Sequence, residues 1–532
     1  MRLRIHQISL KLDYDKADVL SAIARILDCP GDALGQPSLV RRSIDARRKD
    51  VQPKFVLSVE IDYYGVGEPP LAPGRVVLAP EPEEPAPASP VSPPQRPVVV
   101  GAGPAGLMAA LTLAEADAKP LVIERGQDVH VRSHHVATFW QEGVLNPESN
   151  VLYGEGGAGL FSDGKLTTRS KEKGAVRSLL ETLVRLGASP DILIDAEPHV
   201  GSDMLVHLIP AIRERITELG GTFRFDTRLD GLQIVAGTLR GAITTDDEIR
   251  TDALFLASGH SARDTYRMLH AAGVSLAAKP FAIGVRAEMP QSRLNVAQYG
   301  KWATHPKLGP ATFSLTRKAG TTARACYSFC TCPGGVVMAC ASAPGFLTSN
   351  GMSYSRRAKS LGNAAILVPV GLADFPETPD ARELAGMVFQ ESLEKAAFTA
   401  GGGRYSLPAQ PLVDFLAERK GSDLPAERSC KRVVPANLVD LLPPAVAETL
   451  QLQLPRMLRE LNGIRHEDVL LYGIETRSSS PVRIVRDPTT RESISLPGLF
   501  PIGEGSGYAG GIVSSALDGI HAAAHWLRGM TA

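Results

Sequence analysis

The sequence has no excess of either charge, no long apolar run and few cysteines. Lys plus Arg and Asp plus Glu both number 57, so the chain lacks the net field that steers a protein to nucleic acid or to an anionic membrane. No stretch approaches the roughly 20 apolar residues that cross a bilayer, and the first residues alternate apolar with polar side chains, unlike a signal peptide. Six cysteines in 532 residues do not suggest a disulfide scaffold. We therefore expect a cytoplasmic protein with no membrane segment and no nucleic-acid partner.

The first 66 residues predict a small α+β unit. Strands are expected at Arg2–Leu12 and Lys54–Tyr63, with an amphipathic helix at Ala17–Leu27. The basic run Arg41–Lys49 has two interpretations, a solvated loop or helix face, or a docking patch for an anionic partner or for the body of the protein. From Pro69 to Pro97 prolines exclude a helix or a central strand, so this stretch predicts an extended linker.

A glycine fingerprint follows the linker. Three valines run into Gly101-Ala102-Gly103-Pro104-Ala105-Gly106, which precedes an apolar helical segment and a second strand ending in Glu124. This order is typical of a dinucleotide-binding domain, where glycine backbone and a helix N-terminus approach the diphosphate. We expect Glu124 to accept hydrogen bonds from the adenosine ribose, and we include Arg125 and Leu229 among the predicted contacts.

Two distant segments favour FAD over NAD. One strand ends in Ser258-Gly259, where many two-domain FAD proteins have Ala-Thr-Gly, and a late strand ends in Gly503-Glu504. The late segment resembles a closing motif whose acid binds the ribityl chain, with Glu504 in place of the usual Asp. Gly510 and Gly511 then precede Ile512 and an apolar helix, whose first amides are expected to face the flavin or the diphosphate. A domain that binds only NAD does not need this C-terminal segment to come back to the nucleotide site, so the sequence predicts FAD. Nothing in the sequence indicates a covalent link to the flavin.

Several strings resemble those of large bacterial FAD-dependent dehydrogenases of undefined substrate, relatives of the glutathione-reductase and hydroxybenzoate-hydroxylase flavoproteins. They are RRSIDARRK, GEGGAGLFSDGKLTTR (154–169), YSFCTCPGGVV (327–337), NGMSYSRR (350–357) and GEGSGYAGGIVSSALDG (503–519). The resemblance covers essentially the whole chain except the linker. It implies FAD and redox chemistry, and it says little about the substrate.

These observations predict an α/β fold with a doubly wound FAD-binding domain, an inserted antiparallel-sheet substrate domain and a small N-terminal α+β domain. The substrate-domain sheet is expected to open near Lys279 and to run to about Arg486. The predicted boundaries are 1–66 for the N-terminal domain, 67–96 for the linker, 97–275 and 491–532 for the two parts of the FAD-binding domain, and 276–490 for the substrate domain.

The glycine-rich stretch 154–169 is a candidate for the flavin ring. Gly156, Gly157 and Gly159 would let backbone pass close to a planar ring. Lys165 is the charge that could face N1 or O2 of reduced flavin. A surface turn with a solvated lysine is the other interpretation, and we favour flavin contact.

Four cysteines fall within fifteen residues: Cys326, Cys330, Cys332 and Cys340. Their spacing lacks the paired knuckles of a zinc site, and the segment is expected to form two strands joined by a Pro-Gly-Gly turn. A redox pair of Cys330 and Cys332 is an alternative, disfavoured by the expectation that a strand holds the two side chains apart. The favoured interpretation is small apolar residues, with Cys330 or Cys332 lining the pocket. We predict no metal.

No general base follows from the sequence. His134, His135, His260 and His305 have no catalytic arrangement around them, so each is interpreted as structural. Arg286 has two equal interpretations, binding an acidic substrate or pairing with a carboxylate. Lys165, Cys330, Cys332 and Arg286 are thus the catalytic candidates.

The function that follows is an FAD-dependent oxidoreductase, dehydrogenase or reductase, which exchanges hydride with a small organic substrate. Gly401-Gly402-Gly403-Arg404 lacks the strand–helix context of a second nucleotide site, so NAD(P)H or a protein donor would dock transiently. A flavin monooxygenase is the nearest alternative. An RNA-directed flavoprotein and a non-catalytic flavin-binding protein are alternatives from other classes. The oligomeric state does not follow from the sequence.

Overall fold

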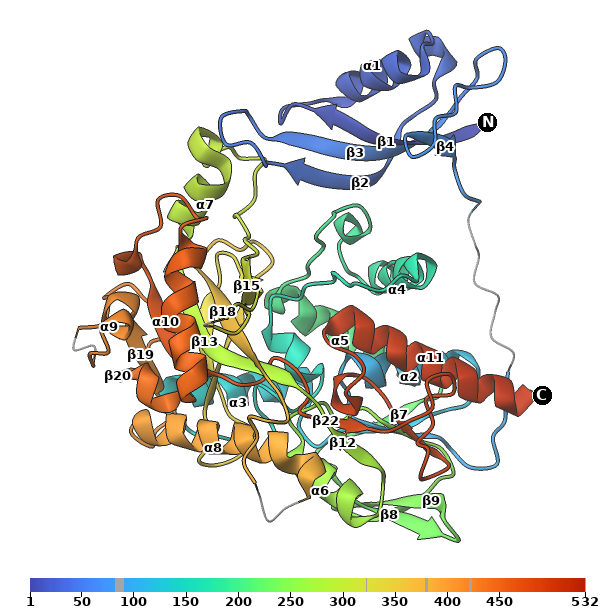
Figure 1. Ribbon diagram of the computed structural model, residues 1–532. Helices are drawn as coiled ribbons and strands as arrows, with labels where there is room; N and C mark the ends of the chain where they lie inside the picture. The colour runs from blue at the N-terminus through green and yellow to red at the C-terminus, as the bar shows by residue number, and fades with distance from the viewer. Residues whose placement is uncertain (82–89, 322, 378–380, 421–422, 532) are drawn as a thin grey trace.

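Alternating apolar residues near the N-terminus form one face of a four-stranded antiparallel sheet. The computed structural model describes residues 1–81, 90–321, 323–377, 381–420 and 423–531. The sheet has the order β2-β3-β1-β4 (Figure 1), with β1 (Arg2–Leu10), β2 (Ser38–Asp45), β3 (Lys54–Asp62) and β4 (Val76–Leu78). Helix α1 (Lys16–Leu27) starts at a capping box of Asp15 and Asp18. Because β4 pairs with β1, the sheet extends past residue 66, and part of the stretch expected to be linker is an edge strand.

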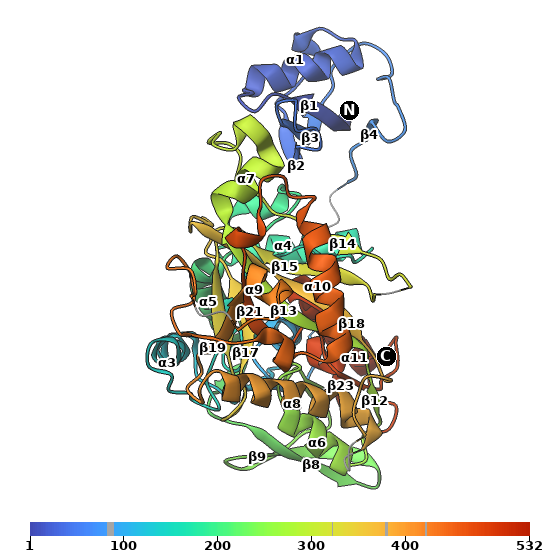
Figure 2. The same ribbon diagram turned by 60° about the vertical axis from the view of Figure 1, so that its left-hand side comes forward.

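The N-terminal unit stands at one end of the molecule, with α1 on the side of its sheet away from the body (Figures 1 and 2). Its strand β2 forms a bridge to Asp195, and Arg42 pairs with that carboxylate at 2.8 Å. Lys49 Nζ donates to the Gln298 carbonyl at 2.9 Å. The basic run is therefore a strand and its extension, which contacts the body through Arg42 and Lys49, while Arg47 and Arg48 are exposed. Among the two interpretations, docking on the body is the one that these contacts support.

The fingerprint region forms a parallel five-stranded sheet of order β23-β11-β5-β6-β7. Its strands are β5 (Val98–Val100), β6 (Leu121–Ile123), β7 (Thr222–Arg224), β11 (Leu254–Leu256) and β23 (Leu499–Pro501). The last strand returns from the C-terminal part of the chain and pairs with β11 in the middle of the sequence.

Both faces of this sheet are buried, and the side chains alternate between them. Val99, Val122 and Phe255 pack with helices α2 (Pro104–Glu115), α5 (Ser202–Glu218) and α11 (Ile512–Thr531). Val98 and Leu256 face the opposite side, covered by α6 (Arg263–Ala271) and an antiparallel sheet of β8 (Leu229–Val235), β9 (Thr238–Thr244) and β10 (Glu248–Arg250). Helices α3 (Val129–Glu142) and α4 (Lys173–Arg185) complete this part. The fold is thus mixed α/β.

A second, seven-stranded sheet is formed by the part of the chain between α6 and β23, and it has the order β14-β15-β18-β13-β21-β19-β20. It consists of β13 (Phe281–Pro290), β14 (Thr316–Arg317), β15 (Cys326–Cys332), β18 (Leu361–Val370), β19 (Leu407–Pro411), β20 (Val433–Pro435) and β21 (Leu470–Glu475). All of its pairs are antiparallel except β19–β20. Its helices are α7 (Gln291–Tyr299), α8 (Ala385–Ala400), α9 (Leu412–Leu416) and α10 (Pro444–Leu458).

Two small ribbons complete the fold. One pairs β12 (Leu276–Ala278) with β22 (Val482–Ile484), and the other pairs β16 (Val336–Cys340) with β17 (Thr348–Met352). The two strands expected around the Pro-Gly-Gly turn are present as β15 and β16, but each pairs with other strands. Across the ranges given above, no helix is long and apolar enough to cross a membrane.

Candidate functional site

A cavity of about 1960 Å³ lies where the carboxyl ends of the parallel strands meet the seven-stranded sheet. The segments after β5, β6, β11 and β23 contribute to one wall, and β13, β15 and β21 contribute to the other. Ligands of open α/β sheets bind beyond the carboxyl ends of the strands. The position of the cavity is therefore the one expected for a dinucleotide.

The fingerprint glycines have different reasons to be glycine. Gly101 has φ of +100°, and a side chain there would overlap the Ala257 carbonyl. A side chain at Gly106 would overlap the Gly101 carbonyl. Gly103 has φ of −83°, and an added Cβ would have the Gly157 Cα as its nearest neighbour, at 3.7 Å. Neither backbone conformation nor packing requires glycine at 103, so the open space that it borders fits a ligand that passes close to the backbone.

The N-terminus of α2 offers unpaired amides to that space. Its N-cap is Gly103, which makes no side-chain capping bond, and Pro104 occupies the first turn. The first amides of a helix lack intrahelical partners and bind anions. Gly510, which precedes α11, also borders open space, because it has no positive φ and a Cβ there would meet no atom within 4 Å, although its own amide donates to Ser514 Oγ at 3.1 Å.

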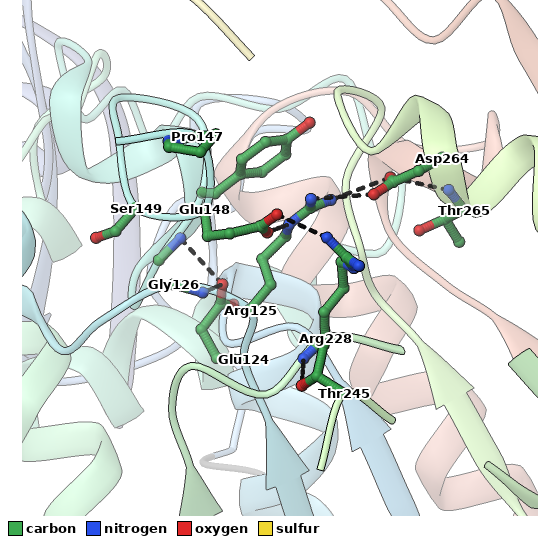
Figure 3. Close-up of polar contacts among 12 residues, drawn as sticks. Glu124, Arg125, Gly126, Pro147, Glu148, Ser149, Arg228, Thr245, Asp264 and Thr265 are labelled. Atoms are coloured by element: carbon green, nitrogen blue, oxygen red, sulfur yellow. Dashed lines mark hydrogen bonds and ion pairs between the residues drawn. The ribbon is translucent and has the colours of Figure 1, made fainter. Parts of the chain in front are cut away.

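Glu124 at the end of β6 is buried and accepts three backbone hydrogen bonds; Figure 3 draws its side chain beside Gly126. Its Oε2 accepts from Ala102 N at 2.8 Å, and its Oε1 accepts from Gly126 N and Gly154 N at 3.0 Å each. The carboxylate thus joins the fingerprint turn to the glycine-rich loop. A carboxylate has about four acceptor positions, so one remains for the ribose hydroxyl that the sequence predicts.

A network of charged residues surrounds the same end of the cavity (Figure 3). Arg125 donates to Glu148 at 2.7 Å and to Asp264 at 3.0 Å, and its guanidinium lies 4.1 Å from the Tyr153 ring centroid. Arg228, which precedes Leu229, donates to the other Glu148 oxygen at 2.7 Å. The network ties together segments after β6, β7 and β11, and so fixes the walls around Glu124.

The glycine-rich loop is held by Arg132 of α3, which is 0% exposed. Its guanidinium donates to five backbone carbonyls, those of Asn150, Val151, Gly154, Glu155 and Gly157. Burial lowers the pKa of Arg132 to about 10, opposed by the nearby carboxylates Glu124 and Glu155. Arg132 thus holds the first part of the loop from outside it, together with Glu124, and Gly157 lies against Gly103.

The C-terminal return is fixed by Asp518 of α11. Its carboxylate accepts from the Gly503 amide at 2.8 Å and pairs with Arg486 and Arg491 at 2.7 and 3.0 Å. Beside it, Glu504 Oε1 lies 3.4 Å from His260 Nδ1, and both residues line the cavity. Glu504 thus reaches the region where the sequence predicts a ribityl contact.

The seven-stranded sheet side carries buried ion pairs. Glu394 pairs with Arg263 and Arg477 at 2.9 and 2.7 Å, and Arg477 lines the cavity. Arg286 is 0% exposed, does not line the cavity and makes two hydrogen bonds of 3.0 Å to Glu475. Of the two interpretations of Arg286, carboxylate pairing is the one that the structure supports.

Lys165 lies in the cavity wall and connects the two halves of the site. Its Nζ donates to the Thr331 carbonyl of β15 and is 3.9 Å from Asp163. Arg357 in turn holds Asp163 through both carboxylate oxygens. Lys165 is therefore neither a solvated surface residue nor free of partners, and its ammonium is placed at the border of the glycine-rich loop and the second sheet.

Cys330 and Cys332 contact each other, which corrects the expectation that the strand separates them. Side chains two residues apart in a strand lie on the same face. In addition, a bulge between Phe329 and Cys332 interrupts the pairing with β18, and Cys330 has φ of +47°. Cys332 Sγ donates to the Cys330 backbone carbonyl at 3.4 Å, Cys330 lines the cavity and Cys332 is buried.

The other cysteines and histidines have separate surroundings. Cys326 and Cys340 are buried, and burial raises the pKa of Cys326 to about 12. Within the described ranges no three metal-ligating side chains gather. His305 pairs with Asp13 at 3.2 Å, while His134 and His135 do not line the cavity. Of the histidines considered from the sequence, only His260 reaches the cavity.

Most of the predicted cofactor contacts line this one cavity, although segments far apart in the chain supply them. They are Gly101, Gly103, Pro104, Ala105, Glu124, Arg125, Gly157, Gly159, Lys165, Leu229, Ser258, Gly259, Gly503, Glu504, Gly510, Gly511 and Ile512. Three others lie behind the wall: Ala102 is buried and donates to Glu124, Gly106 packs on Gly101, and the Gly156 amide donates to the Ala102 carbonyl. Sequence reasoning missed Arg132, Arg477 and Asp518, whose partners come from remote segments.

Three family models match the chain. Residues 96–151 match an FAD binding domain, 280–478 match an FAD-dependent protein, C-terminal domain-like, and 2–62 match a domain of unknown function. With the fold and the cavity, these matches define an FAD-dependent oxidoreductase.

The chain is 42% identical over 550 residues to an uncharacterized protein of Clostridium beijerinckii, covering 99% of this chain and 98% of the relative. It belongs to the same family as that protein, a family of FAD-dependent proteins with a small N-terminal domain.

Solved structures with a similar course of the chain include flavoproteins of low sequence identity. A flavocytochrome c3 fumarate reductase is 13% identical, with 82% of this chain and 79% of that chain covered and a TM-score of 0.36. Glycine oxidase from Geobacillus kaustophilus is 14% identical, with coverage of 82% and 95% and a TM-score of 0.35. Similarities of this size say nothing of the substrate.

Proposed function

We propose that the protein binds FAD without a covalent link along this cavity and exchanges hydride between the flavin and a small organic substrate. The observation that carries the proposal is the set of glycines at the cavity wall, above all Gly103 and Gly510, which neither backbone conformation nor packing requires. Bound FAD would supply the hydride chemistry. The chain supplies binding, orientation and charge.

Each part of the cavity suits one part of FAD. Glu124 and the Arg125 network stand at the adenosine end, and the amides at the start of α2 stand where a diphosphate would lie. Glu504 is proposed for the ribityl chain, and Gly157, Gly159 and the start of α11 for the ring. Lys165 would then oppose the negative charge that reduced flavin accumulates near N1 and O2.

The substrate is proposed to enter between the ring and the seven-stranded sheet. That wall presents Arg477, Asn350 and Ser349 to the cavity. Arg477 is held by Glu394, so its position is fixed before a substrate arrives. A fixed guanidinium at this wall favours an acceptor-bearing substrate, such as a carboxylate or carbonyl compound, over a purely apolar one.

The domain division follows the same proposal. Residues 97–275 and 491–532 form a doubly wound FAD-binding domain, and 276–490 form the inserted substrate domain. The N-terminal domain is proposed as 1–66 with the β4 strand added, and the remaining stretch up to residue 96 as the linker. NAD(P)H or a protein donor would dock transiently.

The visible absorption spectrum of the purified protein, followed anaerobically during addition of NADPH, tests this function. An oxidised flavin spectrum that bleaches supports a reductase half-reaction, and product analysis after oxygen is readmitted separates a reductase from a monooxygenase. A flavin spectrum that NADPH leaves unchanged supports a dehydrogenase reduced by its own substrate or by a protein donor. A colourless protein that cannot be reconstituted with FAD would overturn the proposal.

A further inference from the structure

The paired thiols of β15 have no role in the function proposed above. Cys332 Sγ donates to the Cys330 carbonyl at 3.4 Å, and the Cys332 thiol lowers the pKa of Cys330, so the two residues interact. Both cysteines are free, so the pair is in the dithiol form. Two interacting cysteines on one short segment are candidates for a disulfide.

The backbone holds this pair in an arrangement that a regular strand would not give. Phe329 opposes Ala365 and Cys332 opposes Asn363, so β15 contains one more residue than β18 between these positions. Cys330 has φ of +47°, a left-handed conformation that is costly for a residue with a side chain. Bulges of this kind re-aim side chains beside active sites. Here the bulge aims Cys330 into the cavity while Cys332 stays buried.

Two cations hold the backbone around the pair. Arg286 donates to the Cys330 carbonyl at 3.3 Å, and Lys165 donates to the Thr331 carbonyl between the two cysteines. The hydrogen bond from Cys332 lowers the pKa of Cys330 to about 6, with Arg286 and Lys165 adding to the shift. The pKa of Cys332 is raised. Cys330 is thus the thiolate and Cys332 the proton-bearing thiol, the division of roles found in reactive dithiols.

We propose that Cys330 and Cys332 are a redox couple that exchanges two electrons with the bound FAD. In the oxidising direction the Cys330 thiolate and the Cys332 thiol together lose two electrons and one proton, and a bond forms between the Sγ atoms. The two electrons and the proton convert oxidised FAD to its anionic reduced form, so no further oxidant is needed. In the reverse direction reduced FAD cleaves the disulfide. The proposal rests on the proposed function, because Lys165 is both the predicted flavin contact and the residue that holds Thr331.

A reductive titration of the holoprotein tests the couple. The protein is first oxidised with ferricyanide, desalted and then titrated anaerobically with dithionite while the flavin absorbance is followed. Wild type is expected to take up four electrons per FAD, two in the flavin and two in the disulfide. Cys330→Ser and Cys332→Ser are each expected to take up two. Cys29→Ser, which changes a cysteine of the N-terminal unit, is the matched control and is expected to keep four.

Mass spectrometry of the oxidised wild type gives a readout that does not depend on the variants. After alkylation without reductant, Cys330 and Cys332 should carry no label and their peptide should lack two hydrogens, while dithiothreitol restores both labels. Holoprotein with full FAD that takes up only two electrons, and that labels at both cysteines after oxidation, would overturn the couple alone. Protein that retains no FAD overturns the proposed function as well, and its lack of flavin absorbance distinguishes that failure.

Discussion

Replacing Arg132 by lysine is expected to weaken FAD binding at least about a hundredfold. Five backbone carbonyls of residues 150–157 accept hydrogen bonds from the buried guanidinium. An ammonium group has three donors, so at least two of these carbonyls lose their partner. Each hydrogen bond to a charged group contributes about 1.5–3 kcal/mol. The loss is therefore about 3–6 kcal/mol if the loop keeps its conformation.

The glycine-rich loop avoids part of this cost only by moving, which takes Gly157 away from Gly103. Whether the loop loses these hydrogen bonds or moves, FAD binding becomes weaker by the free energy needed to restore the loop conformation of the wild type. Because about 1.4 kcal/mol corresponds to tenfold in Kd, the lower limit of about 3 kcal/mol corresponds to roughly a hundredfold. The measurement is titration of the apoprotein with FAD, followed by the change in flavin fluorescence, together with the temperature at which the holoprotein releases FAD.

Arg215→Lys provides the matched control. Arg215 lies on α5, is 46% exposed and pairs with Glu218 on the same helix, and such surface pairs contribute about 0–1 kcal/mol. Its Kd for FAD should stay close to that of the wild type. If Arg132→Lys bound FAD within about threefold of the wild type and released it at the same temperature, the view that this side chain organises the loop would be refuted.

Three further predictions follow from single residues. Gly103→Ala should remove bound flavin and leave the chain folded, because the added methyl group makes only an ordinary contact with Gly157 Cα at 3.7 Å; full flavin content with unchanged circular dichroism would contradict the diphosphate placement. Burial alone would raise the pKa of Glu394, but its two arginines lower it from 4.5 to about 2, so about 3 kcal/mol of stability should be lost as the pH falls through that range. In urea unfolding, the free energy of unfolding of Glu394→Gln should not show this loss at low pH. If that free energy fell equally steeply with pH in the wild type and in the variant, the role given to Glu394 would be contradicted. Alkylation of Cys330 by iodoacetamide should be half-maximal near pH 6 and shift to higher pH in Cys332→Ser; an unshifted profile would contradict the hydrogen bond as the cause.

The parallel sheet could be predicted because its signals are local. Three adjacent valines at β5 alternate between two covered faces, so an uninterrupted apolar run is what a strand buried on both sides requires. Gly101 and Gly106 of the following turn are fixed by close contacts within the fold, such as that of Gly106 on Gly101. The linker prediction failed at β4 because three apolar residues between prolines give too short a pattern to reveal pairing with the distant β1.

The supporting residues of the site could not be predicted, because their partners lie elsewhere in the chain. Arg132 occurs among polar residues of α3, a pattern that normally indicates a solvated helix face, yet all of its acceptors are carbonyls of a loop about twenty residues later. Asp518 lies within an apolar helix, and its partner Arg486 lies 32 residues earlier in the chain, before β23. A charged residue inside an otherwise apolar helix is the one signal that would have singled out Asp518.

Two of the non-glycine residues with a left-handed backbone conformation lie at the site. Cys330 and Arg357 both have positive φ, of +47° and +49°, and both line the cavity. Arg357 holds Asp163, which lies beside Lys165, and Lys165 holds the backbone between the two cysteines. Strained residues persist where surrounding contacts fix them, and they gather at functional sites. The strain and the ion pairs thus form one connected structure at the border of the two sheets, which is where the flavin ring and the dithiol are proposed to meet.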